Sequence, residues 1–245
     1  MNAIELADRV KAGEARAVSR LITLLESRDP VGTASLQRLK GSTRRAAVIG
    51  ITGYPGAGKS TLIDQLTAAY RRQEKKVGIV AVDATSPVTG GAILGDRIRM
   101  QGHSSDEGVF IRSMATRGQH GGLAGAVRET VRVLEAAGYD VILLETVGVG
   151  QAEVDFAGVA RTVVAVVAPG LGDEVQAMKA GLLEVAHIVV VNKGDREGAD
   201  TTVRDLKEWV TKVIRTVAIK GEGTPELIEA IAEHQRIVDL KVYGV

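Results

Sequence analysis

The sequence predicts an α/β fold with a mostly parallel central sheet flanked by helices, preceded by a small N-terminal helical extension. From residue 46 onward, short apolar segments rich in β-branched residues alternate with longer segments of helical periodicity. The apolar segments are hydrophobic almost without interruption, which indicates strands buried on both faces of a parallel sheet. Strands are expected over residues 46–51, 77–82, 109–112, 141–144, 163–167, 188–191 and 215–218, and helices over 59–73, 121–137, 173–185, 200–213 and 224–236.

The first forty residues differ from the rest of the chain. They carry apolar side chains at helical spacing, interrupted at Gly13 and at Asp29-Pro30, and they contain no segment of strand type. We expect residues 1–43 to form the helical extension, residues 44–237 the α/β domain, and residues 238–245 a short C-terminal tail. The extension is interpreted as a packing or dimer-contact appendage without chemistry of its own.

Composition excludes several classes of function. Lys and Arg number 31 against 30 Asp and Glu, so the net charge of +1 favours neither nucleic acid nor a membrane surface as a partner. Aromatic residues make up only 3% of the chain, which argues against stacking of single-stranded bases. There is no cysteine, so disulfides, thiolate metal sites and thiol nucleophiles are excluded. The start of the chain is no signal peptide and the apolar runs are too short to cross a bilayer, so we expect a soluble, cytoplasmic protein.

A phosphate-binding loop follows the first expected strand. Residues 53–60 fit the pattern G-x-x-x-x-G-K-[ST], in which glycines let successive backbone N–H groups point at phosphate oxygens at the start of a helix. In this pattern Lys59 neutralises charge on the β- and γ-phosphates and Ser60 offers its hydroxyl to Mg²⁺. The loop predicts contacts to a nucleoside triphosphate from Gly53, Pro55, Gly56, Ala57, Gly58, Lys59, Ser60 and Thr61.

A second motif indicates which base is bound. Asn192-Lys193-Gly194-Asp195 follows the strand expected at 188–191 and matches the pattern N-K-x-D. A carboxylate at Asp195 can accept hydrogen bonds from both N1–H and the exocyclic amino group of guanine, whereas adenine offers no such pair of donors. We expect Asn192 to tie this loop to the phosphate loop and the stem of Lys193 to cover the base. The backbone N–H of Ala218 could meet the guanine carbonyl, although a plain strand end is the alternative there.

Three acids lie where a magnesium ion would need them. Mg²⁺ prefers hard oxygen ligands, usually one or two carboxylates with phosphates and water. Asp83 and Glu145 end expected strands, and Asp96 lies in a glycine-rich segment, so together with Ser60 they form the predicted metal set. Each acid could instead be a helix cap or a surface residue. With Lys59 these acids are the expected catalytic groups, and the backbone N–H of Gly148 is expected to meet the γ-phosphate.

Taken together, these motifs resemble the MeaB/ArgK group of P-loop GTPases, in the SIMIBI class. The resemblance extends over residues 3–237 and is carried by the phosphate loop, by V-D-A-T-S at 82–86, T-G-G-A-I-L-G-D at 89–96, E-T-V-G-V-G-Q at 145–151, and the N-K-x-D motif. It implies a GTPase that uses Mg²⁺ and acts as a chaperone of adenosylcobalamin-dependent methylmalonyl-CoA mutase, gating cofactor loading and protecting the mutase. It also implies that residues 172–179 resemble a mobile loop facing the mutase, for which an ordinary helix N-terminus is the alternative.

Three positions depart from the family's pattern. Ala84-Thr85-Ser86 stands where relatives often have Pro-Ser-Ser, and Val217 stands where a serine commonly precedes Ala218. The sequence stops at Val245, whereas relatives usually continue into a C-terminal dimerisation arm, so homodimerisation through such an arm is left open.

The expected reaction is hydrolysis of GTP to GDP and phosphate by positioning and charge neutralisation. No residue is an obvious water-orienting base, although Gln151 lies near the right loop. The glycine-rich stretch 116–122, with Arg117 and His120, could face an anion or be an ordinary loop. Three other functions stay open: an ATPase or kinase associated with lysine, arginine and ornithine transport, a metal-delivery GTPase for nickel enzymes, and a nucleotide-sensing scaffold without turnover.

Overall fold

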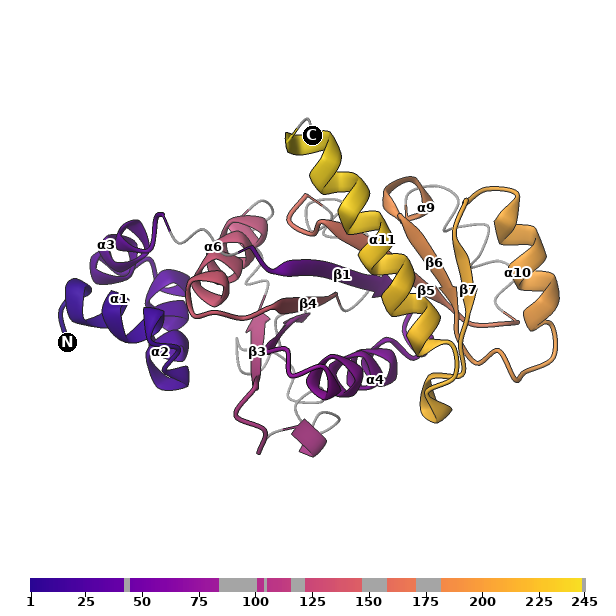
Figure 1. Ribbon diagram of the computed structural model, residues 1–245, viewed down its shortest axis with the longest axis horizontal. Helices are drawn as coiled ribbons and strands as arrows, with labels where there is room; N and C mark the ends of the chain where they lie inside the picture. Colours follow the sequence, from indigo (N-terminus) through magenta and orange to yellow (C-terminus); the bar gives the residue numbers. More distant parts are fainter. Residues whose placement is uncertain are drawn as a thin grey trace.

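A seven-stranded, fully parallel sheet forms the centre of the molecule (Figure 1). The computed structural model describes residues 1–41, 45–83, 101–103, 105–115, 122–146, 158–170 and 182–243. The strands lie in the order β3-β2-β4-β1-β5-β6-β7, and each neighbouring pair is parallel. Their bounds are β1 Ala47–Gly53, β2 Val77–Asp83, β3 Val109–Ala115, β4 Val141–Thr146, β5 Thr162–Val167, β6 Ile188–Val191 and β7 Val213–Arg215. The α/β prediction with a parallel sheet is therefore confirmed.

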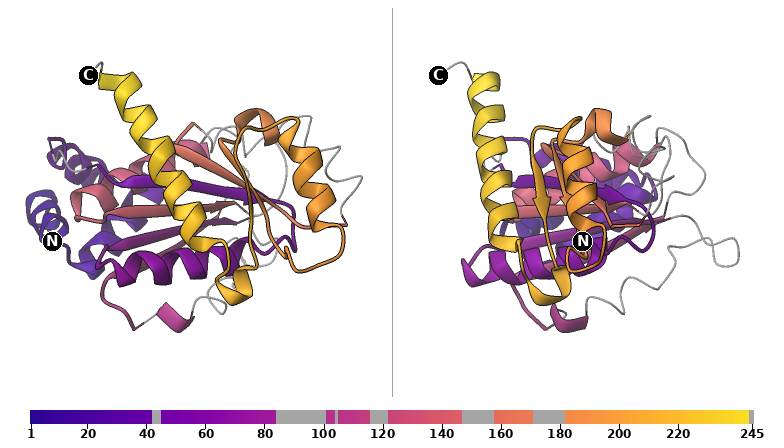
Figure 2. Two further views of the ribbon diagram at one scale, coloured as in Figure 1. Left: turned by 45° about the vertical axis from the view of Figure 1, so that its right-hand side comes forward. Right: turned by 90° about the vertical axis from the view of Figure 1, so that its right-hand side faces the viewer.

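Both faces of the sheet are covered by helices, as the unbroken hydrophobicity of the strands requires. Ile49 and Ile51 of β1 point to the face covered by α4 (Lys59–Arg72) and α11 (Thr224–Tyr243), whereas Val48 points to the opposite face. That opposite face is covered by α6 (Gly122–Ala136) and, beside β5 and β6, by α10 (Ala199–Lys207). The end-on view in Figure 2 shows α11 and α10 on different sides of β7.

The N-terminal extension consists of three helices at one end of the molecule (Figure 1). They are α1 (Ala3–Lys11), α2 (Ala15–Glu26) and α3 (Pro30–Arg38), and they contact α6. Asp29 accepts a hydrogen bond from the N–H of Val31 at 2.8 Å and so caps α3, directly before a proline at its first position. Apolar side chains of α1 and α2 belong to the same buried cluster as those of α6, β2 and β4. The extension therefore shares a core with the sheet.

Four of the expected elements differ from those observed by three residues or more. The strand expected at 109–112 continues to Ala115. The last strand ends at Arg215 instead of beginning there, and Ala218–Lys220 form a 3-10 turn. Helix α10 ends at Lys207, because the chain must turn before β7 starts at Val213. Helix α11 continues to Tyr243, so the expected helix end at residue 236 was wrong and residues 238–243 are not a separate tail. Of the helix expected at 173–185, the structure describes α9 (Leu182–Val185).

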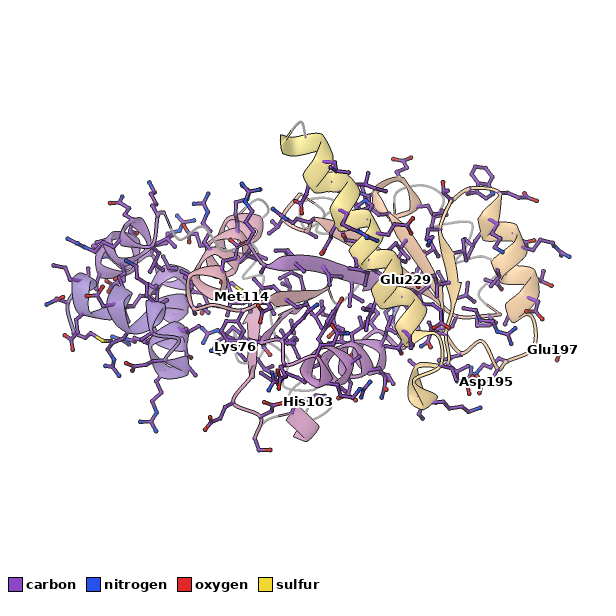
Figure 3. All side chains as sticks on the ribbon, viewed as in Figure 1. Lys76, His103, Met114, Asp195, Glu197 and Glu229 are labelled. Atoms are coloured by element: carbon purple, nitrogen blue, oxygen red, sulfur yellow. The ribbon has the colours of Figure 1, made fainter. Side chains whose placement is uncertain are left out.

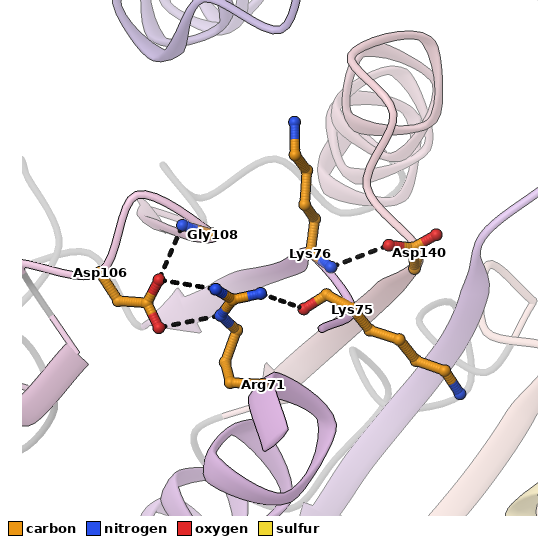
Figure 4. Close-up of polar contacts among 6 residues, drawn as sticks. All are labelled: Arg71, Lys75, Lys76, Asp106, Gly108 and Asp140. Carbon is orange, nitrogen blue, oxygen red and sulfur yellow. Dashed lines mark hydrogen bonds and ion pairs between the residues drawn. The ribbon is translucent and has the colours of Figure 1, made fainter. Parts of the chain in front are cut away.

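A cluster of charged groups fixes the chain that enters β3 against α4 (Figure 4). The guanidinium of Arg71 makes two hydrogen bonds to the carboxylate of Asp106, at 2.8 and 3.0 Å, and a third to the carbonyl oxygen of Lys75. Asp106 also accepts the N–H of Gly108. The hydrogen bond from Arg71 and, to a smaller extent, the one from Gly108 lower the pKa of the Asp106 carboxyl group. Nearby, His103 lies 3.0 Å from Asp64 of α4. The segment before β3 is thus held by the helix that follows the phosphate loop.

Among the described residues, no helix combines the length and the apolar character needed to span a bilayer.

The last turns of α11 project beyond the sheet in both views of Figure 2. There Ile237 and Leu240 have 45% and 57% of their surface exposed.

Candidate functional site

Four of the predicted site residues that the structure describes lie at or near the carboxyl ends of strands. Gly53 ends β1, Asp83 ends β2, Glu145 stands one residue before the end of β4, and Asn192 directly follows β6. Because all strands are parallel, these ends meet at one edge of the sheet, where open α/β sheets bind their ligands. The topology therefore brings together motifs that are far apart in the sequence.

The phosphate loop depends on glycines at three positions. Gly53, Gly56 and Gly58 have φ angles of 135°, 81° and 96°, which L side chains rarely adopt. A Cβ atom at Gly53 would also overlap the carbonyl oxygen of Val166 on β5, and one at Gly58 would overlap the side-chain amide of Asn192. Gly58 is the N-cap of α4, so the N-terminal turn of this helix begins at the loop. This backbone geometry agrees with the phosphate-binding loop that the sequence predicts.

Lys59 lies inside this loop. Its side chain is 7% exposed, and Nζ donates hydrogen bonds to the carbonyl oxygens of Gly53 at 2.7 Å and Tyr54 at 3.2 Å. A buried ammonium group is costly unless it is hydrogen-bonded, and these two carbonyls supply that compensation. Two backbone carbonyls of the predicted phosphate loop thereby hold the positive charge of Lys59.

Ser60 and Glu145 are the predicted metal ligands that the structure brings together. The hydroxyl of Ser60 donates to Oε1 of Glu145 at 2.8 Å, although 84 residues separate the two in the sequence, and Glu145 is 2% exposed. The Ser60 hydroxyl at the start of α4 and the Glu145 carboxylate near the end of β4 are the hard oxygen donors that Mg²⁺ prefers. Asp83 stands at the end of β2, on the far side of β4 from β1.

Among the described residues, no group of three His, Cys, Asp or Glu side chains could hold a metal ion alone. The fit to Mg²⁺ rests on the Ser60 hydroxyl and the Glu145 carboxylate, which are oxygen donors of the kind that this ion prefers.

Asn192 connects the phosphate loop to the two loops at residues 192–195 and 216–218, as the sequence predicted. These loops are called the base-binding loops after their predicted role. Its amide Nδ2 donates to the carbonyl oxygen of Ala57 at 2.9 Å, and its Oδ1 accepts from the hydroxyl of Thr216 at 3.1 Å and the N–H of Ala218 at 3.0 Å. Asn192 is 3% exposed, so these bonds are shielded from water. One buried side chain thus joins the segments that follow β1, β6 and β7.

Lys193 and Asp195 lie on the surface of the same loop. Lys193 has a φ of 57° and donates from Nζ to the carbonyl oxygen of Gly56 at 2.7 Å, a second link to the phosphate loop. Asp195 is labelled in Figure 3, in the loop between β6 and α10 and near the turn that precedes α11. Its carboxylate lies 3.4 Å from the ammonium of Lys220 and is 45% exposed, so it is accessible to a ligand.

The N–H of Ala218 is already engaged with Asn192, so a bond to a guanine carbonyl would have to share or replace that partner. Several other expectations lie outside the described residues: Asp96, Gly148 and Gln151, most of the stretch 116–122, and the segment 172–179.

Sequence reasoning missed two residues beside the base-binding loop. Thr216 bonds to Asn192 through its hydroxyl, and Arg215 contacts the backbone of Gly194 and the carboxylate of Asp200. Both lie at the end of β7, and the misplaced bounds of that strand hid them. A correct strand end would have placed Thr216 directly beside Asn192, because β6 and β7 are paired as far as Val191 and Arg215.

The fold and the linked phosphate and Asn-Lys-x-Asp loops define a P-loop GTPase. Comparison with known proteins gives the same result: the chain belongs to the MeaB family, described as methylmalonyl Co-A mutase-associated GTPase MeaB, whose model matches residues 18–242. The family prediction made from the motifs is therefore confirmed, and the protein is a GTPase.

Curated relatives span bacteria and archaea. A Pyrococcus horikoshii protein named as a GTPase is 52% identical, over 96% of this chain and 78% of its own length. The Escherichia coli GTPase ArgK is 36% identical, over 92% of this chain and 73% of its own. A fused isobutyryl-CoA mutase of Geobacillus kaustophilus is 35% identical, over 82% of this chain but only 19% of its own length.

Solved structures agree on the fold. A protein described as an LAO/AO transport system kinase has a TM-score of 0.75 and 28% identity, covering 99% of this chain and 77% of that one. The hydrogenase maturation factor HypB from Archaeoglobus fulgidus has a TM-score of 0.58 and 24% identity, covering 83% of this chain and 94% of its own. At that identity the likeness to HypB concerns the fold alone.

Proposed function

We propose that this GTPase acts as a chaperone of an adenosylcobalamin-dependent mutase of the methylmalonyl-CoA type, gating cofactor loading and protecting the mutase from inactivation. The observation that carries the proposal is the fused isobutyryl-CoA mutase, in which a sequence related to this chain makes up a small part of a mutase polypeptide. The family description points to the same class of client. Such a function would need a compartment that holds GTP and acyl-CoA thioesters, and we propose the cytoplasm.

The nucleotide is held at two places in this proposal. Backbone N–H groups of residues 53–61 and the ammonium of Lys59 bind the phosphates, while Asp195 accepts the two guanine donors. The stem of Lys193 lies between these sites because its ammonium reaches Gly56. Asn192 holds the two binding loops in register, so nucleotide binding and base selection use one rigid frame.

Magnesium is assigned to Ser60 and Glu145, and the sequence offers Asp83 and Asp96 as further candidates. When bound, the ion would neutralise charge on the β- and γ-phosphates. Before then, the hydrogen bond between Ser60 and Glu145 keeps the hydroxyl at the start of α4 and the carboxylate at the end of β4 beside each other. The chain thus presets the ligands at little further cost in side-chain order.

Hydrolysis then depends on positioning and charge. Lys59 and the N-terminus of α4 hold the phosphates and stabilise negative charge that develops on them. The described part of the chain offers no evident group to orient the attacking water, so intrinsic turnover is expected to be slow and sensitive to the client. GTP hydrolysis would limit how long the GTPase and the mutase stay bound to each other.

A second candidate, a kinase or ATPase linked to amino-acid transport, is favoured by the description of the solved relative alone. It differs in a measurable way, because it requires phosphoryl transfer to an acceptor and no mutase. Metal delivery to a nickel enzyme has less support, since the chain contains no cysteine and its likeness to HypB is one of fold.

The test measures GTP turnover by the purified protein alone, with methylmalonyl-CoA mutase, and with isobutyryl-CoA mutase, from the same source as the chain. We expect one mutase to change turnover and to bind differently with GDP and with a non-hydrolysable GTP analogue. Lys59→Ala protein serves as the control, since it should lose nucleotide and every nucleotide-dependent difference. Turnover and binding that neither mutase alters would contradict the chaperone proposal while leaving the GTPase assignment intact.

A further inference from the structure

Beyond the two motifs, Arg215 contacts the base-binding loop at Gly194. Arg215 is the last residue of β7 and pairs in register with Val191, the last residue of β6. Its Nη2 donates to the carbonyl oxygen of Gly194, and its Nη1 donates to Oδ1 of Asp200 at 2.7 Å. Gly194 is the variable position of the Asn-Lys-x-Asp motif, where the motif itself supplies no side-chain contact.

The peptide unit between Gly194 and Asp195 is the element that Arg215 fixes. On the other side of Gly194, its N–H donates to the carbonyl oxygen of Thr216 at 2.8 Å. The backbone of Gly194 is therefore bonded at both its N–H and its C=O. Because a peptide unit is planar, holding the carbonyl of Gly194 also sets the direction in which the chain enters Asp195.

The packing around Gly194 shows that this contact is built in. A Cβ atom at Gly194 would lie 2.7 Å from Nε of Arg215, so glycine leaves the space that the arginine side chain occupies. A planar guanidinium with several donors can hold a carbonyl and a carboxylate at once, which a lysine cannot do with the same geometry. Asp200 is 89% exposed and orients Arg215 more than it stabilises the fold.

From these contacts we propose that Arg215 is a positioning residue for guanine recognition, which it serves by orienting the Asp195 carboxylate through the backbone of Gly194. This rests on the proposed role of Asp195. Discrimination by a carboxylate requires both of its hydrogen bonds to guanine to be well aligned. Releasing the Gly194 carbonyl would therefore weaken the second hydrogen bond, to the exocyclic amino group, and so reduce selectivity as well as affinity.

The experiment compares GTP with inosine triphosphate, which lacks the exocyclic amino group, in wild type and Arg215→Met. We expect GTP affinity to fall about three- to tenfold, a range set by a charged hydrogen bond on a side chain that is 48% exposed. The preference for GTP over inosine triphosphate should fall at least about threefold, and the loss should fall on KM rather than kcat. A preference equal to that of wild type would overturn the proposal.

Lys212→Met is the matched control. Lys212 precedes the same strand and pairs with Glu233 at 2.9 Å, with side chains 47% and 52% exposed, but it does not contact the base-binding loop. The preference of Lys212→Met for GTP over inosine triphosphate should equal that of wild type. If this preference fell as much as in Arg215→Met, any substitution that weakens β7 would have the same effect, and a specific role of Arg215 would be refuted.

A second variant guards against misfolding of the first. Gly194→Ala forces the side chain of Arg215 away, so it should lower the base preference by a similar factor, and the double variant with Arg215→Met should lose little more. Fully additive losses would contradict the coupling. Asp195→Asn separates this proposal from the proposed role of Asp195. If the variant bound GTP as tightly as wild type, Asp195 would not read the base. If its preference shifted toward xanthosine triphosphate, the role of Asp195 would be supported, whatever the result for Arg215→Met.

Discussion

Asn192→Ala tests the connection between the phosphate loop and the base-binding loops. The substitution removes the donor to the carbonyl oxygen of Ala57 and the acceptor for Thr216 and Ala218. All three partners are almost fully buried, with exposures of 0%, 1% and 2%. Water cannot replace the lost hydrogen bonds without opening the structure, so the penalty should appear in the nucleotide-free protein.

The magnitude follows from the number of groups left unpaired. A buried polar group without a partner costs about 1–3 kcal/mol, and the Thr216 hydroxyl can turn toward another acceptor, so the two groups left unpaired cost roughly 2–6 kcal/mol. For a chain of this length each kcal/mol lowers the melting temperature by about 2–4 °C. We therefore expect Asn192→Ala to melt roughly 4–24 °C below wild type, with weaker GDP binding as well.

Thermal unfolding followed by circular dichroism, first without nucleotide and then with GDP, measures both effects. Thr216→Val provides a graded control, because it removes one of the three bonds and should cost about 1 kcal/mol. Wild type in GDP at a hundredfold excess over Kd should gain about 2.7 kcal/mol, and Asn192→Ala clearly less. If nucleotide-free Asn192→Ala melted within about 2 °C of wild type, the reasoning about a buried polar connection would be refuted.

Three further predictions concern other parts of the structure. Arg71→Met should destabilise the protein by about 1 kcal/mol at neutral pH. Because the pKa of Asp106 is lowered in the folded state, its contribution is complete above the ordinary value of an aspartate and is lost as the pH falls through the lowered pKa. The difference in melting temperature between Arg71→Met and wild type should therefore narrow between pH 7 and about pH 3, and a constant difference would argue against the ion pair. Gly58→Ala should lose GTP binding in equilibrium dialysis and melt at a lower temperature, and combined with Asn192→Ala it should be less than additive, since the new Cβ displaces that amide; additive losses would count against this contact. Ser60→Ala should raise the Mg²⁺ concentration needed for half-maximal GTP hydrolysis at least about tenfold, and an unchanged magnesium titration would remove Ser60 from the metal site.

The fold was predictable where the pattern depends on burial. Strands such as 163–167 and 188–191 are buried on both faces, and their composition alone placed them to within a residue. The bounds of the last strand, β7, could not be predicted in this way. It is short and lies at the sheet edge, and apolar residues continue from it into the turn that follows. The extent of α11 was also missed, since no proline or glycine marks an end between residues 236 and 243.

The site was predictable where a local motif fixes the backbone. Gly53, Gly58 and Asn192 adopt the conformations and contacts that their motifs indicate. The hydrogen bond between Ser60 and Glu145 could be expected only in outline, because it depends on β1 and β4 being neighbours. Arg215 carries no local signal at all: its contact with Gly194 arises from the pairing of β6 with β7 and could be found only in the folded chain.

The preference of the wild-type protein for GTP over ATP tests the central claim most directly, namely that one frame holds a phosphate cradle and a guanine-reading carboxylate. Isothermal titration with each nucleotide in the presence of Mg²⁺ should give an affinity for GTP at least about a hundredfold higher than for ATP, because a site built to accept the guanine donors is left unpaired by adenine. Equal affinities for the two nucleotides, or tight GTP binding that survives Lys59→Ala, would contradict the account.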